Sequence, residues 1–157
     1  MVVNRQQKDE VLAIMPQQRP FRFLDEIFEL NYDVIAGTYR FREDEYFYQG
    51  HFPGHPITPG VILIEAMAQT GVVAFGIFLL MAQGVETHRI KKMATLFATA
   101  DDIEFTGIVY PGEEVIIRGE KVYFRRGNLK TKVNIENKKG DPVCSGILSG
   151  KGVFLDE

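Results

Sequence analysis

The sequence predicts an α+β fold in which an antiparallel sheet covers one long apolar helix. Residues 60–82 form an apolar run with a single charge, Glu65, and the chain after Gly84 reads as strands separated by short turns. Strands joined by consecutive hairpins form an antiparallel sheet, whose apolar face must pack against another element. The chain has 157 residues and contains no repeat, low-complexity tract or linker. We therefore expect a single domain over residues 1–157.

The first part of the chain predicts a short helix followed by two strands. Residues 6–15 place their apolar side chains on one side of a helix, which Pro16 ends. Residues 21–28 and 34–41 read as strands around a polar turn at residues 31–33. One helix and two strands therefore precede the long apolar run.

A loop rich in glycine, histidine and proline leads into the apolar run. It covers residues 49–59, and its end is typical of a helix start, with Thr58 as N-cap and Pro59 at the first helical position. Gly71 and Gly76 suit a helix that other backbone approaches closely. The run is therefore the one long helix that the sequence predicts.

The rest of the chain predicts strands joined by tight turns. The strands are residues 93–99, 102–109, 114–125, 129–136 and 142–154, and the turns are Pro111-Gly112, Gly127-Asn128 and Lys139-Gly140-Asp141. Within residues 129–136, Leu, Thr, Val and Ile alternate with Lys, Lys, Asn and Glu. This alternation predicts a sheet with one buried face and one face in water.

The apolar run is also long enough to span a bilayer. A membrane span would place Glu65 and Gln69 in hydrocarbon, where a carboxylate is costly, and would leave the strands without a central element. An apolar helix in a globular protein is instead enclosed by other elements. We therefore interpret residues 60–82 as a buried helix, covered by the sheet or by a second subunit.

Charge, cysteine content and the N-terminus narrow the class of protein. With 18 Lys and Arg against 21 Asp and Glu, the net charge is −3, so the chain lacks the basic excess of a general nucleic-acid binder. The single cysteine, Cys144, excludes an intrachain disulfide and a CxxC metal site. The polar residues after Met1 do not resemble a secretory signal, so we expect a cytoplasmic protein.

The loop and the start of the helix carry residues suited to acid–base chemistry. His51 lies in a loop stiffened by prolines, and imidazole is the side chain most often used as a base near neutral pH. Glu65 and Gln69 share one face of the helix, where apolar surroundings should raise the pKa of the carboxyl group and suit it to a general acid. The backbone N–H groups of Gly60 and Val61 lie at the positive end of the helix, where they would stabilise a carbonyl oxygen that gains negative charge. We therefore expect base, acid and oxyanion donors to meet at one place.

Each of these residues also has a purely structural interpretation. A loop histidine is most often exposed or structurally bonded, a buried carboxylate can simply bond to backbone, and proline and glycine usually mark turns. Packing alone explains the combination less well, because the only charge of the helix faces the histidine loop. His55 and His88 lack such a context, and we expect both at the surface.

The same residues resemble the signature of a known family. The run HFPGHPITPGVILIEAMAQ, from His51 to Gln69, is similar to the active-site motif of the (3R)-hydroxyacyl-acyl-carrier-protein dehydratases of type II fatty acid synthesis, which have the hot dog fold. Further segments resemble other parts of the family pattern, namely Met15-Pro16, Pro20-Phe21, Leu24-Asp25, Phe97-Ala98, Pro111-Gly112, Arg125-Arg126-Gly127 and Val143-Cys144.

The resemblance implies a hot dog fold, in which six to seven antiparallel strands wrap around the helix. It implies a homodimer that joins two sheets edge to edge, often assembled into a trimer of dimers, with His51 of one subunit facing Glu65 of the other. His51 would take the C2 proton of a 3-hydroxyacyl thioester on acyl carrier protein, and Glu65, supported by Gln69, would protonate or position the departing hydroxyl. Gly60 and Val61 would hold the thioester oxygen through their N–H groups. The product is a trans-2-enoyl thioester, and no metal or other cofactor is implied.

Two segments depart from the family pattern. Glu104-Phe105-Thr106-Gly107 stands where the family commonly has basic residues that dock the carrier protein, and Gln17-Gln18-Arg19 replaces a His-Arg-aromatic run. Other basic residues either supply a docking patch or are ordinary solvated charges, namely Arg125, Arg126, Lys130, Lys132, Lys91 and Lys92. The acyl chain length and the carrier therefore stay open. A hot dog thioesterase, a coenzyme A-linked enoyl hydratase and a non-catalytic binding module remain as alternative functions.

Overall fold

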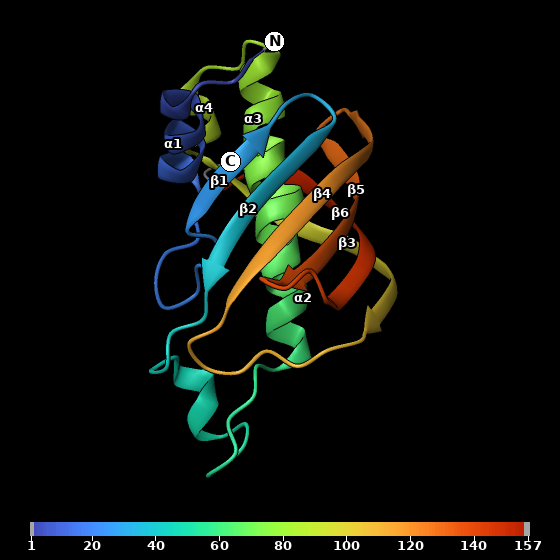
Figure 1. Cartoon of the computed structure of the whole chain (residues 1–157). Helices are drawn as coiled ribbons and strands as arrows, with labels where there is room; N and C mark the ends of the chain where they lie inside the picture. The colour runs from blue at the N-terminus through green and yellow to red at the C-terminus, as the bar shows by residue number, and fades with distance from the viewer. Residues whose placement is uncertain (1, 156–157) are drawn as a thin grey trace.

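A six-stranded antiparallel sheet curls around one long helix (Figure 1). The computed structural model describes residues 2–155, and the strands lie in the order β1-β2-β4-β5-β6-β3. The elements are α1 (Arg5–Ile14), β1 (Glu26–Leu30), β2 (Val34–Arg40), η1 (Tyr46–Gln49), α2 (Gly60–Ala68), η2 (Gln69–Ala74), α3 (Phe75–Ala82), α4 (Thr87–Ile90), β3 (Met93–Phe105), β4 (Glu114–Arg125), β5 (Asn128–Asn137) and β6 (Pro142–Phe154). The α+β hot dog arrangement is thereby confirmed, with six strands.

The predicted long helix is continuous from Gly60 to Ala82 and has three parts. The segments α2 and α3 are α-helical, and η2 between them is a π-helical turn that begins at Gln69. The most apolar stretch of the helix has a mean hydropathy of 1.9, and 78% of that stretch is buried. Its length and composition would suit a membrane span, but this degree of burial is typical of a core helix.

The π-helical turn lies directly against the sheet. A Cβ atom added at Gly71 would lie 2.5 Å from Cγ2 of Val133 and 3.2 Å from Oγ1 of Thr131. Gly71 thus allows the helix backbone to approach β5 at a distance that a side chain would prevent, as the sequence predicts.

We expect Gly71→Ala to lower the free energy of unfolding by about 1–3 kcal/mol, because the added methyl group overpacks the contact with β5. Gly76→Ala is the matched control, since its Cβ would meet only Cδ2 of Leu129, at 3.7 Å. There the higher helix propensity of alanine should leave stability unchanged or raise it by up to about 1 kcal/mol. Urea unfolding measures the free energy of unfolding of the two variants and of the parent protein. Equal effects at both glycines would contradict the packing argument.

The start of the helix differs from the sequence prediction. The helix begins at Gly60 with Pro59 in the N-cap position, and no side chain caps it. The hydroxyl of Thr58 instead lies 2.7 Å from the hydroxyl of Tyr48, and both residues are buried. Because this hydrogen bond engages the threonine oxygen in the core, Thr58 ties η1 to the helix start and leaves the first-turn N–H groups uncapped.

The first strand is shorter than predicted and begins at Glu26 rather than at Phe21. The N–H of Phe23 donates to Oε1 of Gln69 at 2.7 Å, and the carbonyl of Phe21 accepts from Nε2 of Gln69 at 2.8 Å. These two backbone groups thus bond to a side chain of the helix instead of to a neighbouring strand. The segment before β1 is therefore attached to the central helix.

The predicted N-terminal helix is confirmed as α1, one residue earlier at each end, with Asn4 as its N-cap.

The two strands predicted at residues 93–99 and 102–109 form one strand, β3, which ends at Phe105. Its pairing with β6 is interrupted by two bulges, one between Phe97 and Thr99 and one between Asp101 and Glu104. The second begins at Asp101, in the predicted break, whereas the first lies inside the strand predicted at residues 93–99. In the described part of the chain β3 pairs with β6 alone, so its other edge is open. Every residue of β3 is exposed or half-buried.

The last three strands agree with the sequence prediction. The bounds of β4 and β6 coincide with those predicted, and β5 is longer by one residue at each end. The apolar positions of β5 and Thr131 are at most 2% exposed, whereas Lys132 and Asn134 are exposed. The predicted alternation between a buried and a solvated face is therefore confirmed.

Candidate active site

His51 is held in one orientation by its own loop. Its Nδ1 lies 3.0 Å from the carbonyl oxygen of Ile57, and its ring stacks on that of Phe52 with the centroids 4.1 Å apart. The N–H of His51 donates to the carbonyl of Phe47, and the N–H of Ile57 donates to the carbonyl of His51. A carbonyl oxygen only accepts hydrogen bonds, so Nδ1 carries the hydrogen and Nε2 of the neutral ring keeps its lone pair. The half-buried ring thus presents a nitrogen that can accept a proton.

Gln69 connects Glu65 to the segment before β1. The side chain of Gln69 is fully buried, and its Nε2 donates to Oε1 of Glu65 at 3.0 Å as well as to the carbonyl of Phe21. Burial raises the pKa of the Glu65 carboxyl group above its ordinary value, and the hydrogen bond from Gln69 opposes this shift with a smaller effect. Because burial favours the neutral form, Glu65 is suited to donate a proton.

The first turn of α2 leaves two N–H groups unused. Within residues 2–155, the N–H groups of Gly60 and Val61 have no hydrogen-bond acceptor, while the N–H groups that follow bond to the carbonyl of Pro59. Gly60 faces β3, since a Cβ added there would lie 2.9 Å from the ring of Phe105. The positive end of the helix therefore offers two free donors beside β3.

A cavity of about 120 Å³ lies beside Glu65. Its lining consists of Gln17, Glu65, Ala68, Val72, Val73, Thr95 and Phe97. His51 is not among these residues, and Figure 1 shows its loop extending beyond the N-terminal end of α2. One chain thus brings Glu65 and Gln69 together but leaves His51 apart from them.

Six of the seven lining residues were not identified as site residues from the sequence. Three of these six come from segments other than the central helix, namely Gln17, Thr95 and Phe97. Gln17 comes from the segment between α1 and β1, and the other two come from β3. No pattern within either segment indicates that it approaches Glu65. The sequence signals were that Gln17 departs from the family pattern and that Phe97-Ala98 resembles it.

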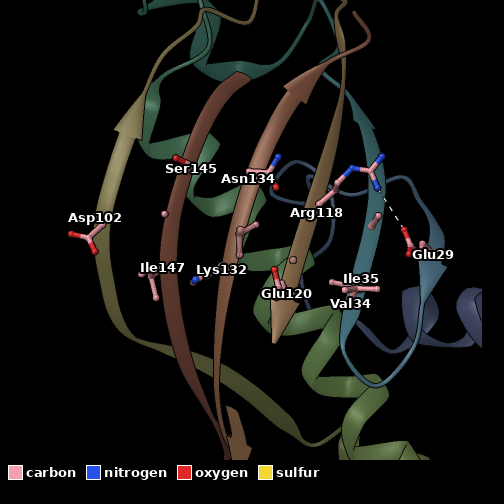
Figure 2. A pocket seen from close by; sticks show the side chains of 14 residues that line it. Glu29, Val34, Ile35, Asp102, Arg118, Glu120, Lys132, Asn134, Ser145 and Ile147 are labelled. Atoms are coloured by element: carbon pink, nitrogen blue, oxygen red, sulfur yellow. Dashed lines mark ion pairs between the residues drawn. The ribbon is translucent and has the colours of Figure 1, made fainter. Parts of the chain in front are cut away.

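A broader hollow of about 520 Å³ lies on the face of the sheet turned away from the helix (Figure 2). Charged side chains of both signs line it, and Arg118 lies 3.5 Å from Glu29. None of the candidate site residues lines this hollow. We therefore place the candidate site at Glu65, on the helix side of the sheet.

The other two histidines and the single cysteine lie outside the site. His55 and His88 are exposed, as expected, and His88 lies 3.1 Å from the carboxylate of Glu86. Burial raises the pKa of the Cys144 thiol to about 11, which keeps it protonated at neutral pH. Among residues 2–155, no group of three or more His, Cys, Asp or Glu side chains is arranged to hold a metal ion.

The sequence of the chain matches a known family. Residues 15–146, which include the His51 loop, the central helix and most of the sheet, match the FabA-like domain. The chain belongs to the FabA-like family. A FabA-like relative from Hydrogenobaculum sp., named 3-hydroxyacyl-acyl-carrier-protein dehydratase FabZ, is 37% identical over 124 residues, which are 78% of this chain and 79% of the relative. The protein of the same name from Geotalea uraniireducens is 37% identical over 142 residues, which are 90% of this chain and 88% of the relative.

Solved structures share the fold of this FabA-like chain at low sequence identity. A chain of the dehydratase heterocomplex ApeI:P from Xenorhabdus doucetiae superposes with a TM-score of 0.75 at 12% identity, covering 91% of this chain and 90% of that one. A mutant thioesterase from Pseudomonas aeruginosa superposes with a TM-score of 0.64 at 10% identity, covering 99% and 97%. Because dehydratases and thioesterases both have this fold, the fold alone does not select the reaction.

The raised pKa of Glu65 predicts a pH-dependent contribution to stability. A carboxyl group whose pKa is higher in the folded than in the unfolded chain binds more protons when folded, at pH values between the two pKa values. Its contribution to the free energy of unfolding therefore falls as the pH rises from the unfolded to the folded pKa. Glu65→Gln removes this titration. We therefore expect the variant to gain stability relative to the parent protein as pH rises from the unfolded to the folded pKa. Urea unfolding across pH, at one protein concentration, measures the difference, and parallel curves would contradict the assignment.

Proposed function

We propose that the chain dehydrates (3R)-3-hydroxyacyl thioesters on acyl carrier protein to trans-2-enoyl thioesters in fatty acid or related lipid synthesis. Nε2 of His51 removes a proton from C2, and Glu65 donates its proton to the C3 hydroxyl group, which leaves as water. The N–H groups of Gly60 and Val61 bind the thioester oxygen as it gains charge. Gln69 holds the carboxyl group of Glu65 in position.

The observation that carries this proposal is the environment of Glu65. Its carboxyl group borders a cavity, burial favours its protonated form, and the fully buried Gln69 fixes its orientation. A group that must protonate a leaving hydroxyl needs these properties, because it has to hold its proton until the C–O bond breaks. Membership in the FabA-like family and the names of the relatives point to the same reaction.

We propose that the complete site forms between two copies of the chain. The free edge of β3 is thirteen residues long and carries exposed apolar side chains, among them Phe97 at 50% and Phe105 at 53%. Val61, which follows the Gly60 that faces Phe105, is 72% exposed. An open, apolar strand edge is suited to pairing with a second strand, and a dimer formed there would bring His51 of one subunit to Glu65 of the other. We further propose that such dimers associate as a trimer of dimers and that the enzyme is located in the cytoplasm.

A panel of thioesters tests the reaction and its carrier. Each 3-hydroxyacyl chain, from four to sixteen carbons, is offered on acyl carrier protein and on coenzyme A, while enoyl formation and free thiol are both measured. We expect enoyl formation from the carrier-bound substrates without release of thiol. Release of thiol would indicate a thioesterase, and a preference for coenzyme A would indicate a coenzyme A-linked hydratase. Saturable binding without turnover would indicate a binding module.

A further inference from the structure

The cavity at Glu65 contains a second polar side chain that the proposed mechanism does not use. Gln17 lines the cavity, its Oε1 is buried, and within residues 2–155 that oxygen has no hydrogen-bond partner. A buried carbonyl oxygen without a donor is unfavourable, so such an atom points to a donor that arrives from outside the chain.

The neighbouring amide cannot fill this role, because the hydrogen bonds of Gln69 are already made. Its Oε1 accepts from the N–H of Phe23, and its Nε2 donates to Phe21 and Glu65. Gln69 is therefore a structural clamp on Glu65. Gln17 borders the same cavity, and its buried Oε1 has no hydrogen-bond partner among residues 2–155.

The loop that carries Gln17 is closed by its own hydrogen bonds and is joined to the central helix at Phe21. Nε2 of Gln18 donates to the carbonyl of Met15, and the N–H of Phe21 donates to the carbonyl of Gln18. Phe21 in turn accepts the hydrogen bond from Gln69. The clamp that orients Glu65 thus also fixes the loop that presents Gln17, so the two side chains keep their places relative to one another.

The chemistry of the leaving group identifies the missing donor. In the proposed dehydration, the C3–O bond breaks and the oxygen leaves as water, carrying its own hydrogen and the proton of Glu65. The 3-hydroxyl oxygen turns a lone pair towards the proton of Glu65. The hydrogen of the same hydroxyl group must therefore point to a separate acceptor. We propose that Oε1 of Gln17 accepts this hydrogen bond and so selects and orients the 3-hydroxyl group of the substrate. This inference rests on the proposed function and assigns a specificity-determining contact within that site.

Thr95 is the residue lining the cavity that has a hydroxyl group. Its oxygen is not among the buried atoms that lack a partner, whereas Oε1 of Gln17 is. Thr95→Val is therefore a matched control, because it removes a polar group from the same cavity without removing the unpaired acceptor.

Binding experiments in a His51→Ala background test the contact without turnover. The ligands are a 3-hydroxyacyl chain and the saturated acyl chain of equal length, each on acyl carrier protein. We expect His51→Ala to prefer the hydroxylated chain, and Gln17→Leu to weaken that preference about five- to tenfold, as expected for one hydrogen bond. Binding of the saturated chain should stay unchanged, which also reports that the site is intact. Gln17→Ala provides a second variant in case leucine disturbs the loop, and Thr95→Val should keep the preference.

The outcomes separate this inference from the proposed function. Enoyl formation by the parent protein tests the reaction, and the preference for the hydroxylated chain tests Gln17. If the parent protein dehydrates its substrate while both Gln17 variants keep the full preference, the contact is refuted and the function stands. Loss of the preference in Thr95→Val alone would assign the contact to Thr95 instead. A parent protein that forms no enoyl thioester would overturn the reaction and, with it, the role of Gln17.

Discussion

His51→Ala is expected to lower the rate of enoyl thioester formation by about 10²–10⁴-fold, the usual contribution of a positioned general base. The loop that holds His51 is closed by backbone hydrogen bonds, and within residues 2–155 only one hydrogen bond, from Nδ1 to the carbonyl of Ile57, uses the imidazole ring. The substitution should therefore leave the fold and its stability nearly unchanged. Steady-state kinetics and urea unfolding of the same preparation measure the two effects.

His55→Ala is the matched control for this prediction. His55 lies in the same loop, is exposed, and uses only backbone groups in its hydrogen bonds with Phe52. We expect this variant to keep full activity. A His51→Ala protein whose activity stays within tenfold of the parent would remove His51 from the proposed mechanism.

Gln69→Leu is expected to affect stability and activity together. The leucine would leave the buried N–H of Phe23 and the carbonyl of Phe21 without partners, at a cost of about 3 kcal/mol. It would also release Glu65 from the hydrogen bond that orients it, so activity should fall even where the protein remains folded. Urea unfolding and kinetics well below the midpoint of thermal unfolding separate the two losses.

Thr70→Val is the control for that substitution, at the next residue of the same helix. Thr70 is as fully buried as Gln69, but in the part of the chain described its hydroxyl has no hydrogen-bond partner. Replacing an unpaired hydroxyl by a methyl group of similar shape should be neutral or stabilising. The account of Gln69 fails if the two substitutions cost the same.

The elements that the sequence predicted well are those whose signals are local. The bounds of β4 and β6 were correct because the turns beside them contain glycines, and Gly112, Gly127 and Gly140 all have the positive φ that such turns require. The long helix was predicted because its apolar run is unbroken from Gly60 to Ala82. The joint placement of Glu65 and Gln69 followed from helical periodicity, and their hydrogen bond confirms it.

The features that were missed depend on contacts between distant segments. The strand begins later than predicted because the carbonyl of Phe21 and the N–H of Phe23 bond to Gln69, far along the chain. The π-helical turn could not be predicted from the sequence. A wider helical turn is built from the same residue types as an α-helix. Gln17 reaches the cavity at Glu65 only because that loop packs on the helix, and neither segment alone reveals the contact.

Mixing two inactive variants tests the central claim, that His51 and Glu65 act together across the interface between two subunits. His51→Ala and Glu65→Gln proteins are unfolded together, refolded as a mixture and assayed for enoyl formation beside each variant alone. In a mixed dimer with a shared site, one of the two sites has both native residues, so statistical mixing should restore roughly a quarter of the parent activity. If both residues act within one chain, every subunit carries a defect, and the mixture would be no more active than the separate variants.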